Sequence, residues 1–135
     1  MEIDLSIDCK ETINIIKDFI KTYVKNSGCK TVVVGLSGGV DSTLTTILCI
    51  KTLGKNNTLC LFLPDETTPK DDIKHQKLIV EKYNLKCKQI NISTVVKQMS
   101  SICPIKPDKL SLANLKARIR MTLLMEYANT TKSIV

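Results

Sequence analysis

The segment Gly35-Leu36-Ser37-Gly38-Gly39-Val40-Asp41-Ser42 joins a short β-branched run, residues 31–36, to an apolar stretch that continues to Leu53. Adjacent glycines let a backbone approach a ligand closely, and the start of a helix offers unpaired N–H groups at the positive end of its dipole. A turn of this kind suits an anion, above all pyrophosphate. The serines add hydroxyl groups, and a Mg²⁺ ion that bridges Asp41 to phosphate oxygens would explain the acidic residue. The segment therefore predicts a nucleotide-phosphate site.

Two better-known phosphate motifs do not fit this segment. The mononucleotide P-loop places a lysine directly before its final serine or threonine, and that position holds Asp41. The dinucleotide pattern GxGxxG is also absent, because the glycines stand at 35, 38 and 39. The alternative without a ligand is a tight turn whose aspartate or serine merely caps the next helix. Two serines and an aspartate around the glycines favour the binding site.

Strand and helix patterns alternate on either side of the segment. A short apolar run predicts a strand at residues 58–63, and an alternating pattern predicts another at 86–92. Ser133–Val135 look like the first residues of a fourth strand. Helical patterns run from Ile13 up to Gly28 with a cap at Asp8, from Ser42 to Leu53, from Pro69 to Tyr83 with a cap at Thr68, from Ser93 to Met99 and from Leu112 to Ala128. Connections of this length imply an α/β fold: a parallel sheet with helices on both faces, which binds ligands at the carboxyl ends of its strands.

The composition is that of one ordinary globular domain. The chain has 135 residues, of which 43% are hydrophobic and 24% charged, and we expect a single domain over residues 1–135 that ends inside its fourth strand. No apolar run reaches the roughly 20 residues of a membrane span and no signal peptide is visible, so we expect a cytoplasmic protein. Six cysteines without a CxxC pair predict reduced thiols that act as small hydrophobes. The net charge of +7 favours anionic partners.

The loop also carries a resemblance to a known superfamily. Ser37–Ser42 resembles the SGGxDS pyrophosphate loop of the N-type ATP pyrophosphatases, which adenylate a carboxylate or amide oxygen and release pyrophosphate. Asn114–Met121 resembles the NxxARxRM helix of the NAD synthetases. Leu63-Pro64, with Thr68-Pro69 and Asp72, resembles the segment after the second strand of that family. The resemblance covers nearly the whole chain and implies a Rossmann-like fold of the adenine nucleotide alpha hydrolase type.

The resemblance implies an ammonia-dependent NAD synthetase, a ligase that forms a carbon–nitrogen bond. The nicotinate carboxylate of deamido-NAD would attack the α-phosphate of ATP, and ammonia would then displace AMP. The resemblance further implies Mg²⁺ on Asp41, a deamido-NAD contact for Arg118, and a homodimer that builds the deamido-NAD site between its subunits. No side chain is evident as a nucleophile, and this mechanism needs none. Contacts to ATP are implied for Gly35, Leu36, Ser37, Gly38, Gly39, Val40, Asp41 and Ser42.

The helical pattern at residues 112–128 has apolar residues around nearly its whole circumference, so we expect a largely buried helix. A guanidinium at Arg118 then needs an anionic partner, because an uncompensated buried charge is strongly destabilising. That partner is either an acidic residue of the chain or, as the resemblance implies, deamido-NAD. Lys116 and Arg120 lie together on another side of this helix. Residues 65–67 form either an ordinary loop or part of a lid over ATP.

Two other functions remain open at this point. A tRNA-modifying ATP pyrophosphatase of the lysidine or thiouridine type would use the +7 charge to bind nucleic acid. The absence of a CxxC pair and of a basic extension argues against nucleic acid as a partner. The other alternative is a nucleotide-binding chain without turnover. We expect the 135 residues alone to be inactive, because they end inside the fourth strand and lack the rest of the site. We expect ammonia to be free or supplied by another protein, because the segment before the first strand is too short for a glutaminase domain.

Overall fold

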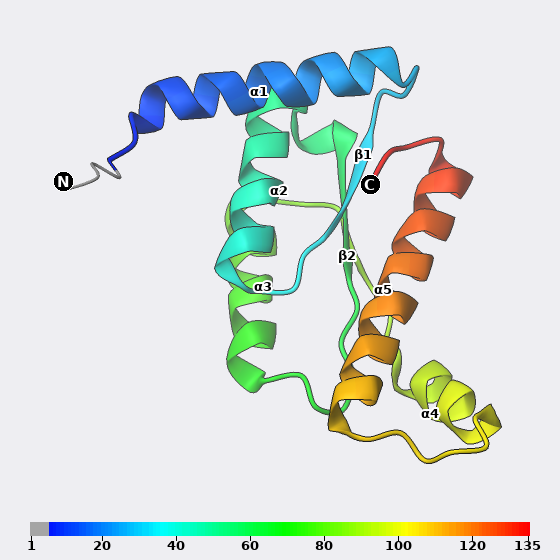
Figure 1. The fold of residues 1–135 in the computed structure, drawn as a ribbon. Coiled ribbons are helices and arrows are strands. Elements are labelled where there is room, and N and C mark those ends of the chain that lie inside the picture. The colour runs from blue at the N-terminus through cyan, green and yellow to red at the C-terminus, as the bar shows by residue number, and fades with distance from the viewer. Residues whose placement is uncertain (1–5) are drawn as a thin grey trace, which may run out of the picture.

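The computed structural model describes residues 6–135 and shows the expected alternation of strands and helices (Figure 1). Within that range the elements are α1 (Cys9–Asn26), β1 (Val32–Gly35), α2 (Val40–Leu53), a short 3₁₀ turn η1 (Lys55–Asn57), β2 (Thr58–Phe62), α3 (Lys70–Tyr83), β3 (Cys87–Gln89), α4 (Ser93–Ile102) and α5 (Lys109–Thr131). The α/β fold class is therefore confirmed.

The sheet is parallel, in the order β1-β2-β3. Ile134, just beyond α5, forms a parallel bridge with Val32 of β1, and the Val33 N–H donates to the Ile134 carbonyl at 2.7 Å. Because β2 already pairs with β1 on one side, this bridge lies on the other side of β1. Ile134 thus lies beside β1 where the predicted fourth strand would begin, although it forms only a single bridge. The chain passes from β3 across to the far edge of β1, and such a switch in strand order marks the ligand-binding edge of an open α/β sheet.

Helices cover both faces of the sheet, with α2 and α3 on one side and α4 and α5 on the other (Figure 1). Side chains alternate between the faces along each strand, as the period of two requires. Val33 and Leu61 pack with Ile119 of α5 and Val96 of α4, whereas Cys60 packs toward α3. This three-layer packing confirms the predicted architecture.

Helix capping follows the sequence at one helix and departs from it at another. The Asp8 carboxylate accepts hydrogen bonds from the backbone N–H groups of Lys10 and Glu11, both at 2.9 Å, and caps α1 as predicted. The predicted cap at Thr68 is wrong, because α3 begins after Pro69, which has no side-chain capping bond. The hydroxyl of Thr68 instead accepts from the backbone N–H of Asp65 at 2.9 Å.

The helix α5 is less buried than its sequence predicts. Ile119 and Ala128 are fully buried, but Leu110, Met121 and Met125 are 70%, 50% and 48% exposed. The prediction of a largely buried helix is wrong, because α5 is an outer layer that packs on the sheet along one side. Its other side meets no element among residues 6–135.

The cysteines are all free thiols. Cys49 and Cys60 are buried, which confirms their role as small core residues, and Cys87 is half-buried. Burial raises the pKa of the Cys60 thiol to about 12, so this thiol stays protonated. Cys9 and Cys103 are exposed. No helix among residues 6–135 combines the length and the hydropathy needed to cross a bilayer.

Candidate functional site

The loop between β1 and α2 is closed by its own two serines. The Ser37 and Ser42 hydroxyl oxygens lie 2.9 Å apart, and the Ser42 hydroxyl also accepts from the Ser37 N–H at 3.2 Å. Ser42 donates to the Gly39 carbonyl at 3.1 Å, and the Gly39 N–H donates to the Ser37 hydroxyl at 3.3 Å. These bonds fold the chain back at the carboxyl end of β1, so the serines shape the loop as well as offering polar groups to a ligand.

The adjacent residues Gly38 and Gly39 differ in whether the fold leaves room for a side chain. Gly38 has φ +97°, and a Cβ atom there would lie 2.2 Å from the carbonyl oxygen of Asp72 in α3. The loop therefore packs so tightly on the first turn of α3 that no side chain fits at position 38. Gly39 has φ −75°, and a Cβ atom there would meet the Ser37 hydroxyl oxygen at an ordinary 3.5 Å.

The helix α2 begins at Val40, two residues earlier than predicted, with Gly39 as its N-cap and no side-chain capping bond. Its first-turn N–H groups and positive dipole end therefore lie at the loop without a side-chain cap, which is the arrangement that binds anions. Asp41 is exposed in this first turn. Its carboxylate forms no hydrogen bond or ion pair with the residues that the structure describes.

A cavity of about 650 Å³ opens at the carboxyl ends of β1 and β2. Of the eight residues predicted to contact ATP, Gly35, Leu36 and Ser37 line it, whereas residues 38–42 lie outside its wall. The remaining lining residues are Leu61, Phe62, Leu63, Pro64, Asp65, Thr67, Thr68, Pro69, Asp72, Lys109, Leu112, Ala113, Lys116, Arg120 and Leu124. The cavity is thus mostly apolar, with three cations from α5 and two carboxylates, Asp65 of the β2–α3 connection and Asp72 of α3.

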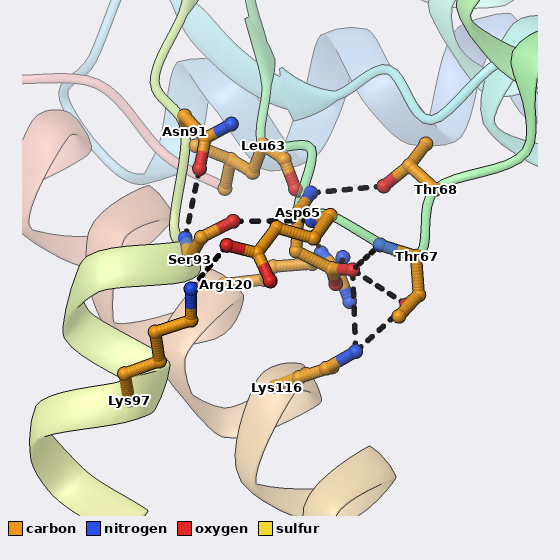
Figure 2. A network of polar contacts seen from close by, with 10 residues as sticks. Leu63, Asp65, Thr67, Thr68, Asn91, Ser93, Lys97, Lys116 and Arg120 are labelled. Atoms are coloured by element: carbon orange, nitrogen blue, oxygen red, sulfur yellow. Dashed lines mark hydrogen bonds and ion pairs between the residues drawn. The ribbon is translucent and has the colours of Figure 1, made fainter.

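A buried carboxylate, Asp65, organises the charged side of this cavity (Figure 2). Its side chain is 5% exposed. One oxygen accepts from the Thr67 N–H at 2.7 Å, the Thr67 hydroxyl at 2.6 Å and Lys116 Nζ at 3.2 Å. The other accepts from Arg120 Nη2 at 2.8 Å. Two cations of α5 therefore converge on one carboxylate of the β2–α3 connection.

The Asp65 cluster, which consists of Asp65, Thr67, Lys116 and Arg120, joins the connection after β2 to α5. Arg120 Nε donates to the Leu63 carbonyl at 2.9 Å, and Lys116 Nζ donates to the Thr67 hydroxyl at 2.8 Å. Burial by itself would raise the pKa of Asp65, but the hydrogen bonds from Thr67 and Lys116 outweigh that effect and lower the pKa to about 2. Asp65 is therefore a fixed negative charge at neutral pH. The sequence alone did not single out Asp65. An aspartate after a buried strand, together with Lys116 and Arg120 one helical turn apart, is the pattern that could have indicated this cluster.

A second cavity of about 600 Å³ lies on the other side of the Asp65 cluster, against α4. Asp65, Thr67, Leu112 and Lys116 line both cavities. At this cavity Lys97 forms an ion pair with Glu66, and the Glu66 N–H donates to the Ser93 hydroxyl at 3.1 Å (Figure 2). Residues 65–67 are therefore held from both sides.

The structure places Arg118 away from both cavities. The residue is exposed on α5, and its side chain forms no hydrogen bond or ion pair with residues 6–135. The predicted burial of its guanidinium is wrong, and so is the alternative of an ion pair with an acidic residue, as far as the described residues reach. Asn114, Met121 and Met125 are exposed on the same helix. Among residues 6–135 no group of three or more His, Cys, Asp or Glu side chains could hold a metal ion.

Known proteins resemble this chain over nearly its whole length. The sequence model described as NAD synthase matches residues 12–135. A protein named NH(3)-dependent NAD(+) synthetase from Hyperthermus butylicus is 44% identical over 126 residues, which cover 93% of this chain and 46% of that relative. The protein of the same name from Methanocaldococcus jannaschii is 38% identical over 129 residues, covering 93% of this chain and 50% of the relative.

Solved structures agree with the sequence matches. The NH3-dependent NAD synthetase from Campylobacter jejuni, in complex with the nitrate ion, superimposes with a TM-score of 0.89 at 32% identity, covering 96% of this chain and 56% of that one. Residues 12–135, which the NAD synthase sequence model matches, contain both the β1–α2 loop and the Asp65 cluster. The chain spans about half the length of the curated relatives it matches.

Proposed function

The chain belongs to the NAD synthase family, and from this premise we propose that it binds ATP for the ammonia-dependent conversion of deamido-NAD to NAD. The observation that carries the proposal is the serine-closed loop before the uncapped start of α2, inside a chain that matches the family over residues 12–135. Because the chain spans about half the length of its relatives, the complete reaction is part of the proposal. No observation favours a tRNA substrate.

The phosphates of ATP are proposed to bind at the start of α2. The N–H groups of its first turn and the positive dipole end stabilise charge on the departing pyrophosphate, which is the electrostatic contribution this loop makes to the reaction. Asp41 fits a Mg²⁺ ion, because its exposed carboxylate has no partner among residues 6–135 and because Mg²⁺ typically takes one or two carboxylates together with phosphate oxygens. The bound ion would neutralise part of the phosphate charge.

The adenosine end of ATP is proposed to enter the 650 Å³ cavity next to the loop. The cavity wall includes Leu36, Leu63 and Leu124, and an apolar wall of this kind suits a flat, uncharged ring. The α-phosphate then lies between the cavity and the loop. There the nicotinate carboxylate attacks the α-phosphorus, the bond to pyrophosphate breaks, and a mixed anhydride forms. Ammonia attacks its carbonyl carbon and AMP leaves, so no side chain has to act as a nucleophile.

Deamido-NAD is proposed to contact Arg118, and the exposed side of α5 is proposed to meet a second subunit. The supporting observation is that a guanidinium without an intramolecular partner shares this helix with half-exposed Met121 and Met125. Apolar side chains of this size on one outer face are typical of an interface. Sedimentation of the protein would show a dimer. A cytoplasmic location is also proposed, in line with six free cysteines.

The test of the proposed function is calorimetric titration with ATP at saturating and at zero Mg²⁺. The protein is expected to bind ATP more tightly with Mg²⁺, and Asp41→Ala is expected to abolish that difference. The matched control is Asp18→Ala, which removes an exposed aspartate from α1, remote from the loop. Equal Mg²⁺ dependence in the protein and in the Asp41→Ala variant would show that the metal assignment is wrong.

A further inference from the structure

The ATP cavity has three cationic side chains in its wall, and two of them are already engaged by the protein. Lys116 directs its ammonium group to Asp65 and Thr67 and is 14% exposed. Arg120 donates through Nε to the Leu63 carbonyl and through Nη2 to Asp65. Figure 2 shows both side chains reaching toward Asp65. The donors that could hold a phosphate in this cavity are therefore turned to partners inside the protein.

The third cation, Lys109, is exposed and shares the cavity wall with the carboxylate of Asp72, without an ion pair between the two. The wall thus carries three positive and two negative charges, and Asp65 supplies one of the negative ones. Without it, Lys116 and Arg120 would keep only neutral acceptors, the Thr67 hydroxyl and the Leu63 carbonyl. Two partly buried cations lacking a counter-ion attract whatever anion can enter.

The site thus has two parts, the start of α2 and the cavity, which suit different chemical groups. The start of α2 offers N–H groups to an anion, whereas the cavity is lined mostly by apolar side chains. A nucleotide has an anionic end and a neutral end, and both places lie within reach of one molecule because Ser37 belongs to the loop and to the cavity wall. If the cavity attracted phosphate, a nucleotide could bind in the reverse direction, with its α-phosphate displaced from the place of attack.

We propose that Asp65 is a specificity-determining residue, which neutralises Lys116 and Arg120 so that the cavity accepts the uncharged adenosine end and leaves the phosphates to the start of α2. The inference rests on the proposed function, because it presupposes a nucleotide at this site. It assigns to a buried carboxylate that touches no reacting atom the task of fixing the direction in which the substrate lies.

The test measures whether pyrophosphate and adenosine compete. Adenosine binding is followed by amide chemical shifts, with and without saturating inorganic pyrophosphate. In the unaltered protein the two ligands occupy different places, so pyrophosphate should change the Kd of adenosine less than about twofold. In Asp65→Asn, pyrophosphate should enter the cavity and compete with adenosine there, so the apparent Kd of adenosine should rise about tenfold once pyrophosphate is at about ten times its Kd for the cavity.

Two further variants make the result specific. Glu66→Gln removes a neighbouring carboxylate that lies outside the ATP cavity, and it should show no competition. Asp65→Asn combined with Lys116→Met should lose part of the competition, because one of the two freed cations is gone and Arg120 remains. Should Asp65→Asn fail to fold by circular dichroism, Thr67→Val loosens Lys116 more gently and should raise the apparent Kd of adenosine about threefold with pyrophosphate.

The outcomes separate the two proposals. If the unaltered protein binds neither ligand, the proposed function is wrong, and this inference with it. If it binds both independently and a folded Asp65→Asn variant does too, the proposed function stands and the inference is overturned. Competition in Glu66→Gln would also overturn it, because that carboxylate lies outside the cavity. Undiminished competition in the double variant would overturn it too, because a freed Lys116 would then contribute nothing to pyrophosphate binding.

Discussion

The two neighbouring strands β1 and β2 end in regions of opposite character. After β1, the chain turns through Ser37–Ser42, where hydroxyl, N–H and carbonyl groups of Ser37, Gly39 and Ser42 bond to one another and remain largely exposed. After β2, Asp65 is buried and is joined to cations 51 and 55 residues away. The first region has N–H groups at the start of α2 without a side-chain cap, which could bind an anion. In the second region, Lys116 and Arg120 already have a counter-ion, Asp65. We propose that a phosphate site and a place that excludes phosphate lie side by side at this sheet edge.

The largest effect is expected where the first region meets α3. Gly38→Ala places a Cβ atom 2.2 Å from the Asp72 carbonyl oxygen at a φ of +97°, so the loop or the helix start must move. We expect a loss of about 3 kcal/mol in the free energy of unfolding, measured by urea titration. Gly39→Ala, with ordinary space for its Cβ atom, is the matched control and should cost less than about 1 kcal/mol. Equal losses would show that the loop does not depend on that contact.

A smaller loss is expected in the second region. Asp65→Asn leaves Lys116 and Arg120 without their counter-ion, although the partial exposure of Arg120 moderates the penalty. We expect the free energy of unfolding to fall by about 2 kcal/mol. Glu66→Gln breaks the exposed pair with Lys97 and should cost less than about 0.5 kcal/mol. If Asp65→Asn and Glu66→Gln lower the free energy of unfolding equally, the Asp65 cluster stabilises the fold no more than the exposed Glu66–Lys97 pair does.

The contribution of Asp65 should also appear in the pH dependence of the free energy of unfolding. Because the pKa of Asp65 is lowered from 3.8 to about 2 in the folded protein, its carboxylate stabilises the fold fully above pH 4. That contribution, about 2 kcal/mol, is lost as the pH falls from about 4 to 2. The difference in unfolding free energy between the protein and Asp65→Asn should therefore shrink over this range. A constant difference would mean that the pKa of Asp65 is not lowered.

The smallest effect on stability is expected at Arg118, whose exposed side chain forms no hydrogen bond or ion pair with residues 6–135. Arg118→Ala should change the free energy of unfolding by less than about 0.5 kcal/mol. It should weaken deamido-NAD binding about tenfold in calorimetry, the usual size for one charged hydrogen-bonding contact, and spare ATP. Arg118→Lys keeps the charge and should lose less. Equal weakening of ATP and deamido-NAD would contradict the assignment.

The contrast between the two regions also explains what the sequence could predict. The β1–α2 loop could be recognised because its groups are consecutive, and strand, glycines and helix start are all local signals. The link from Asp65 to Arg120 could not, because it depends on how α5 packs beside β2. The Thr68 hydroxyl accepts from the Asp65 N–H within the β2–α3 connection and does not cap α3, so the predicted cap was wrong. Apolar residues around α5 predicted burial, but burial requires a neighbour on each side, and the outer side of α5 has none among residues 6–135.

The most direct test of the account is a crystal structure of the protein with Mg²⁺ and a non-hydrolysable ATP analogue. The account predicts the β- and γ-phosphates at the N–H groups of the first turn of α2, the metal ion on Asp41, and the adenine ring in the cavity beside Leu36. The bonds from Lys116 and Arg120 to Asp65 should remain intact. Phosphates bound to Lys116 and Arg120, with the adenine ring away from the cavity, would contradict it.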